Sequence, residues 1–290
     1  MGTNNMRDIK RRIKSVQSME HITNAMKLVS AAKLRKAKNI FDKTQENFHF
    51  ITEAIEEVFH NTEDVPAHYL RGNREIKTTA YIVLSSCRGL CGSFNSNVIK
   101  YTQSVIDAYP NENKPYIVAI GDKTRDYFAK RGHVILSDYC LPPEDITFQE
   151  SHDISRPIID MYDRGEIDEV CLVYTQFINT LQQKVVEVTL LPFDVSVNPY
   201  EHLLQKQVEY EPSAQAVFNY LVPKYVEIMV YSAIVESATC EHAARRMAME
   251  SATDNAKDMI SDLTLTYNRT RQAAITREIS EIVGGAEALA

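Results

Sequence analysis

The chain has no long apolar run, and this absence excludes several classes of protein. No stretch of its 290 residues approaches the roughly 18 consecutive apolar residues of a membrane-spanning helix. The start of the chain, MGTNNMRDIKRR, lacks the apolar core of a secretory signal, and there is no transit peptide. We therefore expect the protein in the cytoplasm, or at a membrane only through its partners.

Cysteine is scarce and lacks the spacing of a metal site. The five cysteines include no CxxC pair and have no histidine at ligand spacing: Cys87, Cys91, Cys140, Cys171 and Cys240. This pattern predicts reduced thiols rather than a disulfide framework or a zinc site. We predict no metal and no cofactor.

Motifs of catalysis are missing as well. The chain contains no HExxH, GxSxG, GxGxxG, GKS or GKT. The segment RGLCGSFN at residues 88–95 follows a predicted strand and opens a helix, so its backbone amides could hold a phosphate. We favour a tight structural turn there and predict no catalytic residue, although an enzyme whose site has no sequence motif stays an alternative.

What the chain does have is a very long helical pattern at each end, from Met6 to about Phe59 and from Ser213 to about Val283. Helices of globular domains average about 11 to 12 residues. At 1.5 Å per residue these two would run roughly 80 and 100 Å. We predict an antiparallel coiled coil in which the C-terminal helix projects alone at its tip.

Apolar residues spaced three and four apart predict the contact seam of this pair. In the N-terminal helix they are Ile9, Ile13, Val16, Met19, Ile22, Met26 and Val29. In the C-terminal helix the predicted seam is Met247, Ser251, Ala256, Met259, Leu263, Tyr267 and Ala274. Small and hydroxyl-bearing residues flank the second seam, which indicates close approach to something that encloses the pair.

Proline and glycine predict where the final helix starts, bends and stops. Pro212 suits its first turn. Pro223 predicts a local kink, or a break between a short helix and a long one. Gly284 and Gly285 are expected to end it.

The middle of the chain alternates between strand and helix patterns. Predicted strands are Lys77–Ser85, Tyr116–Ile120, His133–Ser137, Glu169–Tyr174 and Lys184–Leu191, and predicted helices are Asn95–Ala108, Lys123–Lys130 and Phe148–Tyr162. Runs such as AYIVL and VCLVY suit strands covered on both faces. The fold class is therefore α/β plus a long coiled coil: a Rossmann-like, mostly parallel sheet, with an antiparallel edge after the 176–182 turn. Predicted domains are residues 1–62, 63–208 and 209–290.

Charge is unevenly distributed along the chain. The formal net charge is −7, yet residues 7–43 are strongly basic. A basic helix is typical of proteins that bind nucleic acid, an anionic membrane or a protein partner with acidic walls. No aromatic residue interleaves with these charges before Phe41, which counts against nucleic acid.

Three segments resemble a known family: MRDIKRRIKSVQSMEHITNAMKLVSAAKLRKAK, SSCRGLCGSFN and EHAARRMAMESATDNAKDMISDLTLTYNRTRQAAITREISEIVGGAEAL. They are similar to the gamma subunits of F-type ATP synthases, and the resemblance covers essentially the whole chain. It implies two end helices in an antiparallel coiled coil and a Rossmann-like foot.

The resemblance also implies a function without a catalytic site. Such a subunit stands inside a ring of three alpha and three beta subunits, while its foot joins the epsilon subunit and the membrane's c ring. Ion flow turns the c ring and the shaft, whose unequal faces drive each beta subunit through ATP synthesis. The absence of an inserted regulatory dithiol favours a bacterial subunit at the cytoplasmic face of the cell membrane.

Site residues follow from the resemblance at matching positions. The implied contacts with the alpha and beta ring are Met26, Lys27, Lys33, Arg245, Arg271, Gln272, Thr276 and Glu278. The implied contacts with the c ring and epsilon are Arg88, Tyr210 and Glu211. Cys87 stands where the family commonly has Asp. A rotor subunit, a Rossmann-type enzyme and a basic coiled-coil protein that binds nucleic acid or acts as a scaffold are thus the three hypotheses.

Overall fold

The protein consists of two compact units. A computed structural model describes residues 2–61, 66–72, 75–108, 114–140, 146–193, 211 and 213–287. Unit 1 comprises Met1–Ser30 and Arg245–Ala290, and unit 2 comprises Ala31–Ala244. Two helices contribute to both units: α1 (Gly2–Asn61) and α5 (Ala214–Glu287). The predicted long terminal helices are therefore confirmed.

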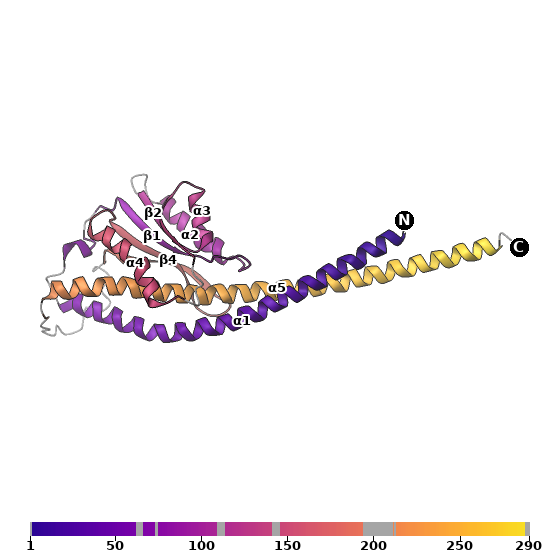
Figure 1. Ribbon diagram of the computed structural model, residues 1–290, viewed down its shortest axis with the longest axis horizontal. Coiled ribbons are helices and arrows are strands. Elements are labelled where there is room, and N and C mark those ends of the chain that lie inside the picture. The colour runs from indigo at the N-terminus through magenta and orange to yellow at the C-terminus, as the bar shows by residue number, and fades with distance from the viewer. Residues whose placement is uncertain are drawn as a thin grey trace. The chain divides into compact units, whose positions relative to one another are not determined.

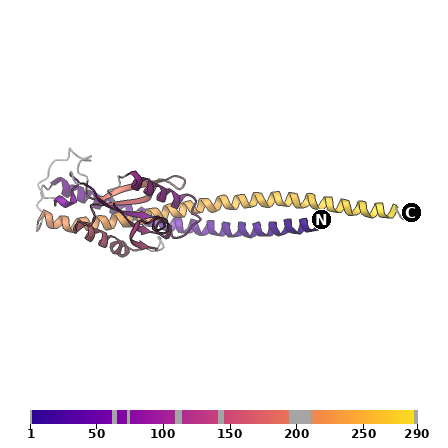
Figure 2. The same cartoon turned by 90° about the horizontal axis from the view of Figure 1, so that it is seen from above.

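In unit 1 the two helices lie side by side and run antiparallel, as predicted (Figures 1 and 2). The Thr253 hydroxyl donates a hydrogen bond to the Thr23 hydroxyl at 2.8 Å, which fixes the register of the pair. Counting twenty-one residues outward from this contact along each helix leads to Gly2 on α1 and Ala274 on α5. The remainder of α5 extends past the start of α1 (Figure 2).

The seam on α1 differs from the predicted one. The seam follows a strict alternation of three and four residues, with Asn24 and Met26 half-buried beside it: Met6, Ile9, Ile13, Val16, Glu20, Thr23, Lys27 and Ser30. The prediction holds as far as Val16, and Met26 is half-buried, but Met19, Ile22 and Val29 are exposed. Each three-residue step turns a side chain back by about 60° around the helix, so two successive steps carry it off a seam that repeats every 3.5 residues.

The seam on α5 needed a similar correction. Its less exposed side chains are Met249, Thr253, Ala256, Ile260, Leu263, Tyr267, Thr270 and Ala274, again at steps of four and three. Of the predicted seam residues, Ala256, Leu263, Tyr267 and Ala274 lie in this seam, whereas Met247, Ser251 and Met259 are exposed. Because the real repeat passes through Thr253 and Thr270, the largest apolar side chains did not mark it.

Unit 2 is built on a five-stranded sheet in the order β3-β2-β1-β4-β5. Its strands are β1 (Thr78–Leu84), β2 (Lys114–Ile120), β3 (Val134–Tyr139), β4 (Glu169–Phe177) and β5 (Gln183–Leu191). The first four are parallel, and β5 pairs antiparallel with β4. The predicted strands, their direction and the antiparallel edge are confirmed.

Helices cover both faces of this sheet (Figure 1). One face packs against α2 (Phe94–Ala108) and α3 (Asp122–Ala129) through a core that includes Tyr81 and Phe128. The other face packs against α4 (Phe148–Asp163) and the first part of α5 through Ile82, Ile158 and Val226, among others. The apolar runs predicted this, since a strand buried on both faces has little room for polar side chains.

Local capping explains why α4 begins where it does. The Thr147 hydroxyl accepts a hydrogen bond from the Glu150 amide, and the Glu150 carboxylate accepts one from the Thr147 amide at 2.6 Å. This reciprocal pair satisfies two amides that would otherwise lack partners at a helix start. A short 3-10 helix, η1 (Ala67–Tyr69), lies near the other end of α4, where Tyr69 donates a hydrogen bond to Asp163.

Of the two alternatives predicted for Pro223, a local kink or a break in the final helix, the break is wrong. The helix α5 continues through Pro223 without interruption. Proline has no amide hydrogen, so the carbonyl four residues earlier loses its helical hydrogen bond. That carbonyl belongs to Asn219, which is exposed, so water can donate a hydrogen bond to it instead. Val222 and Val226, on either side, are fully buried and hold the helix against the sheet.

The prediction that Gly284 and Gly285 end this helix is also wrong, because α5 runs to Glu287.

The prediction of five reduced thiols is wrong for two of them. Cys87 and Cys140 form a disulfide with a Cα–Cα distance of 6.0 Å, while Cys91, Cys171 and Cys240 are free and buried. The two bonded residues are 53 positions apart in the sequence. They meet because β1 and β3 are parallel and their carboxyl ends lie at the same edge of the sheet.

Candidate functional site

In unit 1, α1 has exposed apolar side chains that do not face α5. Met19, Ile22 and Val29 of α1 are between 57 and 61% exposed, and Leu28 is 62% exposed. At the same levels of the helix, the seam positions are the polar residues Glu20, Thr23 and Lys27. An exposed apolar stripe of this kind marks a surface that binds another protein.

The helix α5 also exposes large apolar side chains. Met259 and Leu265 are each 54% exposed within the paired part of the helix. Ala274 lies at the level of Gly2, where α1 begins. Past it, four more large apolar side chains are exposed: Ile275, Ile279, Ile282 and Val283. Sequence reasoning did not select these residues. Their spacing of four, three and one is visible in the sequence, but the predicted seam ended at Ala274.

The implied ring contacts lie in both units. On α1, Met26 and Lys27 are half-buried in unit 1, whereas Lys33 is half-buried in unit 2. On α5, Arg245 is half-buried at the start of unit 1's segment.

The other four implied ring contacts, Arg271, Gln272, Thr276 and Glu278, are exposed within two turns of α5. Gln272 lies three and seven residues before Ile275 and Ile279, and therefore shares their face of the helix. Arg271 and Glu278 are two turns apart on one side. The structure thus gathers these four residues beside the unpaired apolar tip.

The implied foot contacts are more scattered. Arg88 is exposed in the turn after β1, and Glu211 is exposed shortly before α5. Tyr210 lies outside the described residues.

The turn at residues 85–95 is held by its own side chains. The Asn95 carboxamide oxygen accepts a hydrogen bond from the Ser86 amide at 2.9 Å, and its nitrogen donates to the Cys91 thiol at 3.1 Å. Leu90 and Gly92 adopt positive φ angles of 64° and 59°. These contacts favour the structural turn over the phosphate-binding hypothesis, because the turn's groups bond to one another.

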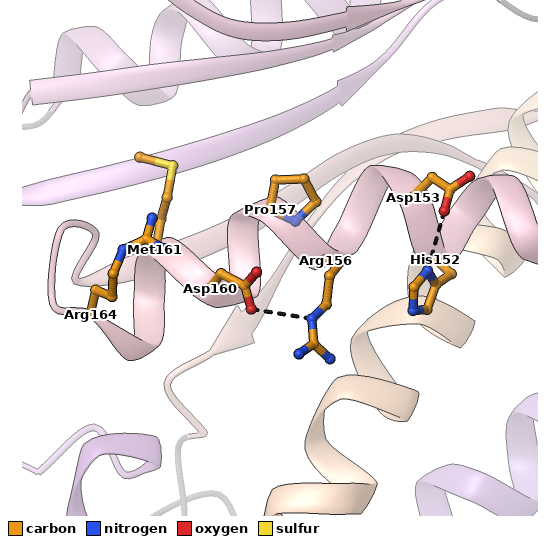
Figure 3. Close-up of a pocket in the computed structure, with 7 residues that line it drawn as sticks. All are labelled: His152, Asp153, Arg156, Pro157, Asp160, Met161 and Arg164. Carbon is orange, nitrogen blue, oxygen red and sulfur yellow. Dashed lines mark hydrogen bonds and ion pairs between the residues drawn. The ribbon is translucent and has the colours of Figure 1, made fainter.

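A shallow groove runs along α4 (Figure 3). It has a volume of about 440 Å³ and is lined by residues of that helix, including His152, Arg156 and Asp160, and by Arg164 directly after it. Its charged groups pair with neighbouring side chains: Arg156 Nε lies 3.2 Å from Asp160, and His152 lies 3.3 Å from Asp153 through Nδ1 and 3.7 Å from Glu227 of α5 through Nε2. The side chains do not converge on a point where a substrate would react.

In the described part of the chain, no helix combines the length and apolar character needed to span a membrane.

The fold and its surfaces define a class of protein: an antiparallel coiled coil with exposed apolar side chains, joined in sequence to a doubly wound α/β domain. Comparison with known proteins identifies the family. A family profile described as ATP synthase matches residues 5–289. The chain belongs to the gamma chain family of ATP synthases, whose members form the central stalk rotor and are non-catalytic subunits of that complex.

Several relatives carry this conclusion. The chain is 47% identical over 285 residues to the ATP synthase gamma chain of Desulforamulus reducens, with 98% of each chain covered. It is 45% identical over 288 residues to that of Alkaliphilus metalliredigens, again with 98% of each covered.

Solved structures show the same fold at lower identity. A chain of the Euglena gracilis mitochondrial ATP synthase F1 and c-ring structure matches with a TM-score of 0.71 and 19% identity, covering 99% of this chain and 95% of that one. A chain of the Tetrahymena thermophila central stalk and c-ring structure matches with a TM-score of 0.61 and 22% identity, covering 80% and 99%.

Proposed function

We propose that this chain couples ion-driven rotation of a c ring to ATP synthesis, and ATP hydrolysis to ion pumping, through unequal contacts of unit 1 with an alpha3-beta3 ring. The observation that carries the proposal is the set of exposed apolar side chains on α1 and α5. Burying such side chains against ring subunits removes apolar area from water, at roughly 25 cal/mol per Å².

The coupling needs contacts that differ between ring subunits. A ligand shifts a conformational equilibrium only when it binds the conformations unequally, and here the helix pair acts as the ligand. Two antiparallel helices have no threefold symmetry, so three equivalent subunits around them meet three different surfaces. Each beta subunit is thereby held in a different conformation at any one angle.

Charged residues of both units supply further polar contacts, with Lys27 in unit 1 and Lys33 in unit 2. Lys27 and Lys33 suit acidic loops of beta subunits, and Met26 lies beside them in the sequence. Arg271 can pair bidentately with a carboxylate, with Gln272 as its polar neighbour. Arg245, Thr276 and Glu278 complete the proposed ring contacts.

The foot makes the second set of contacts. Arg88, Tyr210 and Glu211 are proposed to contact the epsilon subunit and the c ring. Attachment to the c ring would place the subunit at the cytoplasmic face of a bacterial cell membrane, held there through its partners.

Native mass measurement of the purified complex tests the assembly. We expect one copy of this chain per three alpha and three beta subunits, and we expect Ile22→Lys to weaken that association, because Ile22 is 61% exposed in the chain itself. Ser18→Lys, at an exposed position on the same helix, is the matched control. Equal retention of both variants would count against the apolar stripe as a ring contact.

The coupling itself is tested by Met26→Lys. The new charge joins a basic stretch beside an acidic loop, so we expect ATP-driven ion pumping to fall more than assembly does. Pumping equal to that of the parent complex would refute the role proposed for Met26.

A further inference from the structure

We propose that Cys87, Asp122 and Cys140 form a binding site for a thiophilic divalent metal ion, such as zinc, when the Cys87–Cys140 disulfide is reduced. The three residues come from separate segments: the turn after β1, the first residue of α3 and the residue after β3. Their ligand atoms lie within 4.8 Å of one another.

The distance between two of these ligand atoms already suits a metal. Asp122 Oδ2 lies 3.5 Å from Cys140 Sγ. For a tetrahedral ion with bonds of about 2.3 Å to sulfur and about 2.1 Å to oxygen, the two ligands would be about 3.6 Å apart. Reduction frees Cys87 Sγ to move away from Cys140 Sγ and take a third position, and water would take the fourth.

The backbone around the site is held in place without the disulfide. The Ser85 amide donates to the Ile120 carbonyl at 2.7 Å, and the Gly121 amide donates to the Tyr139 carbonyl at 2.8 Å. The Thr124 amide donates to the Ser85 hydroxyl at 3.0 Å. These bonds tie the three ligand-bearing segments together, so reduction leaves the thiols near each other.

A second group orients the carboxylate. Arg125 Nη1 lies 3.0 Å from Asp122 Oδ1 and 3.1 Å from Asp138 Oδ2. The guanidinium therefore occupies one oxygen of Asp122 and leaves Oδ2 directed toward Cys140. Outer contacts of this kind fix the ligand's orientation in metal sites. Arg125 also offsets part of the three negative charges that two thiolates and a carboxylate bring to a divalent ion.

The chemistry requires thiolates, which the oxidised pair lacks. A dithiol reductant passes two electrons and two protons to the disulfide and becomes a cyclic disulfide itself. Each thiol then releases its proton to solvent as the metal binds. Soft thiolate ligands favour zinc over magnesium or calcium. Cys140 is exposed and Cys87 and Asp122 are half-buried, so a metal ion can reach the site.

Cobalt titration of the full-length chain, reduced with a dithiol and then freed of it without oxygen, tests the site. We expect the thiolate-to-cobalt charge-transfer band and the visible bands of tetrahedral cobalt. Cys87→Ala and Cys140→Ala should abolish the band, and Asp122→Asn should weaken affinity by about tenfold or more. Cys240→Ala and Asp258→Asn, the latter at an exposed position of α5, are the matched controls and should bind as the parent does, with circular dichroism confirming that every variant is folded.

A second measurement uses the parent chain alone. Zinc should slow iodoacetamide labelling of Cys87 and Cys140 in the reduced chain, as read by peptide mass spectrometry. If the reduced, folded chain shows no thiolate band above that of Cys87→Ala, or zinc leaves the labelling unchanged, the proposal is overturned. The result is independent of assembly with the ring, so it stands or falls separately from the proposed function.

Discussion

At the scale of single residues, one buried acid in unit 2 has an unusual environment. Glu236 of α5 is 6% exposed and accepts a hydrogen bond from the Phe177 amide at 2.8 Å. Burial raises the pKa of this carboxyl above its ordinary value of 4.5, although the bonds from Phe177 and Tyr174 act in the opposite direction. The fold therefore favours the protonated acid.

The pH dependence follows from the sign of that shift. Since the folded protein keeps the proton to a higher pH than the unfolded chain, the contribution of Glu236 to stability is complete below about pH 4.5 and is lost as pH rises through the raised value. We expect Glu236→Gln to raise the thermal midpoint at pH 8 and to change it little at pH 4.5, because glutamine keeps an acceptor for Phe177 without the charge. Thermal unfolding at both pH values measures this, and a larger gain at the lower pH would contradict it.

The seam residues of α1 show which contacts could be predicted from the sequence alone. Ile9, Ile13 and Val16 predicted the seam correctly because apolar side chains there follow the 3.5-residue repeat. Beyond Val16 the seam passes to Glu20 and Thr23, and the apolar residues turn outward. Periodicity assigned those residues to the core because a sequence does not show whether an apolar stripe faces its own chain or a partner.

At the scale of elements, close packing at the carboxyl edge of the sheet restricts which residue can stand at position 121. Gly121 joins β2 to α3 with a φ of 107°, and a Cβ placed there would lie 2.2 Å from the Ser85 carbonyl oxygen. That carbonyl belongs to the segment that leads from β1 to Cys87. The edge therefore admits only glycine at this position.

Alanine substitutions at two glycines distinguish the cost of a positive φ angle from the cost of a steric clash. We expect Gly121→Ala to lower the free energy of unfolding by about 3 kcal/mol or more, since it combines a positive φ with a clash against backbone. Gly132→Ala is the control: its φ is 80°, but a Cβ there meets nothing within 4 Å, so only about 1 kcal/mol of strain is expected. Urea unfolding of both variants measures the difference, and equal losses would rule out the clash.

The elements were the most predictable part of the fold. Strands such as Thr78–Leu84 combine an apolar run with flanking breakers, and the alternation with helices predicted a parallel sheet. The Cys87–Cys140 pair was not predictable in this way, because it depends on the order in which strands lie in the sheet. The continuity of α5 through Pro223 was not predictable either, because it depends on the burial of neighbouring residues, which outweighs the lost hydrogen bond.

At the scale of the whole molecule, the two units are built from different amounts of apolar burial. Unit 2 has layered cores on both faces of its sheet, whereas in the described part of unit 1 the fully buried apolar side chains are Ile9, Met249 and Ala256. We relate this contrast to the proposed function, in which unit 2 folds on its own core and unit 1 completes its burial against ring subunits.

Shortening the chain tests how the end of α5 contributes to the complex. We expect removal of residues 281–290 to weaken coupling modestly, because this segment lies past Ala274, where pairing with α1 ends. Removal of residues 271–290 should weaken it far more, since Arg271, Gln272, Thr276 and Glu278 are lost. ATP-driven ion pumping by the two shortened complexes compares them, and similar losses from both would contradict the proposed contacts.

The length of α5 that follows Ala274 has a further consequence. Most helical stability in proteins comes from packing of a helix face, and among the described residues no second helix lies alongside the thirteen from Ile275 to Glu287. Their helical order in the isolated chain must then depend on temperature and solvent. In the complex it would depend on the surrounding walls. Amide hydrogen exchange at these residues would thus report how tightly an enclosing ring closes around the axle's tip.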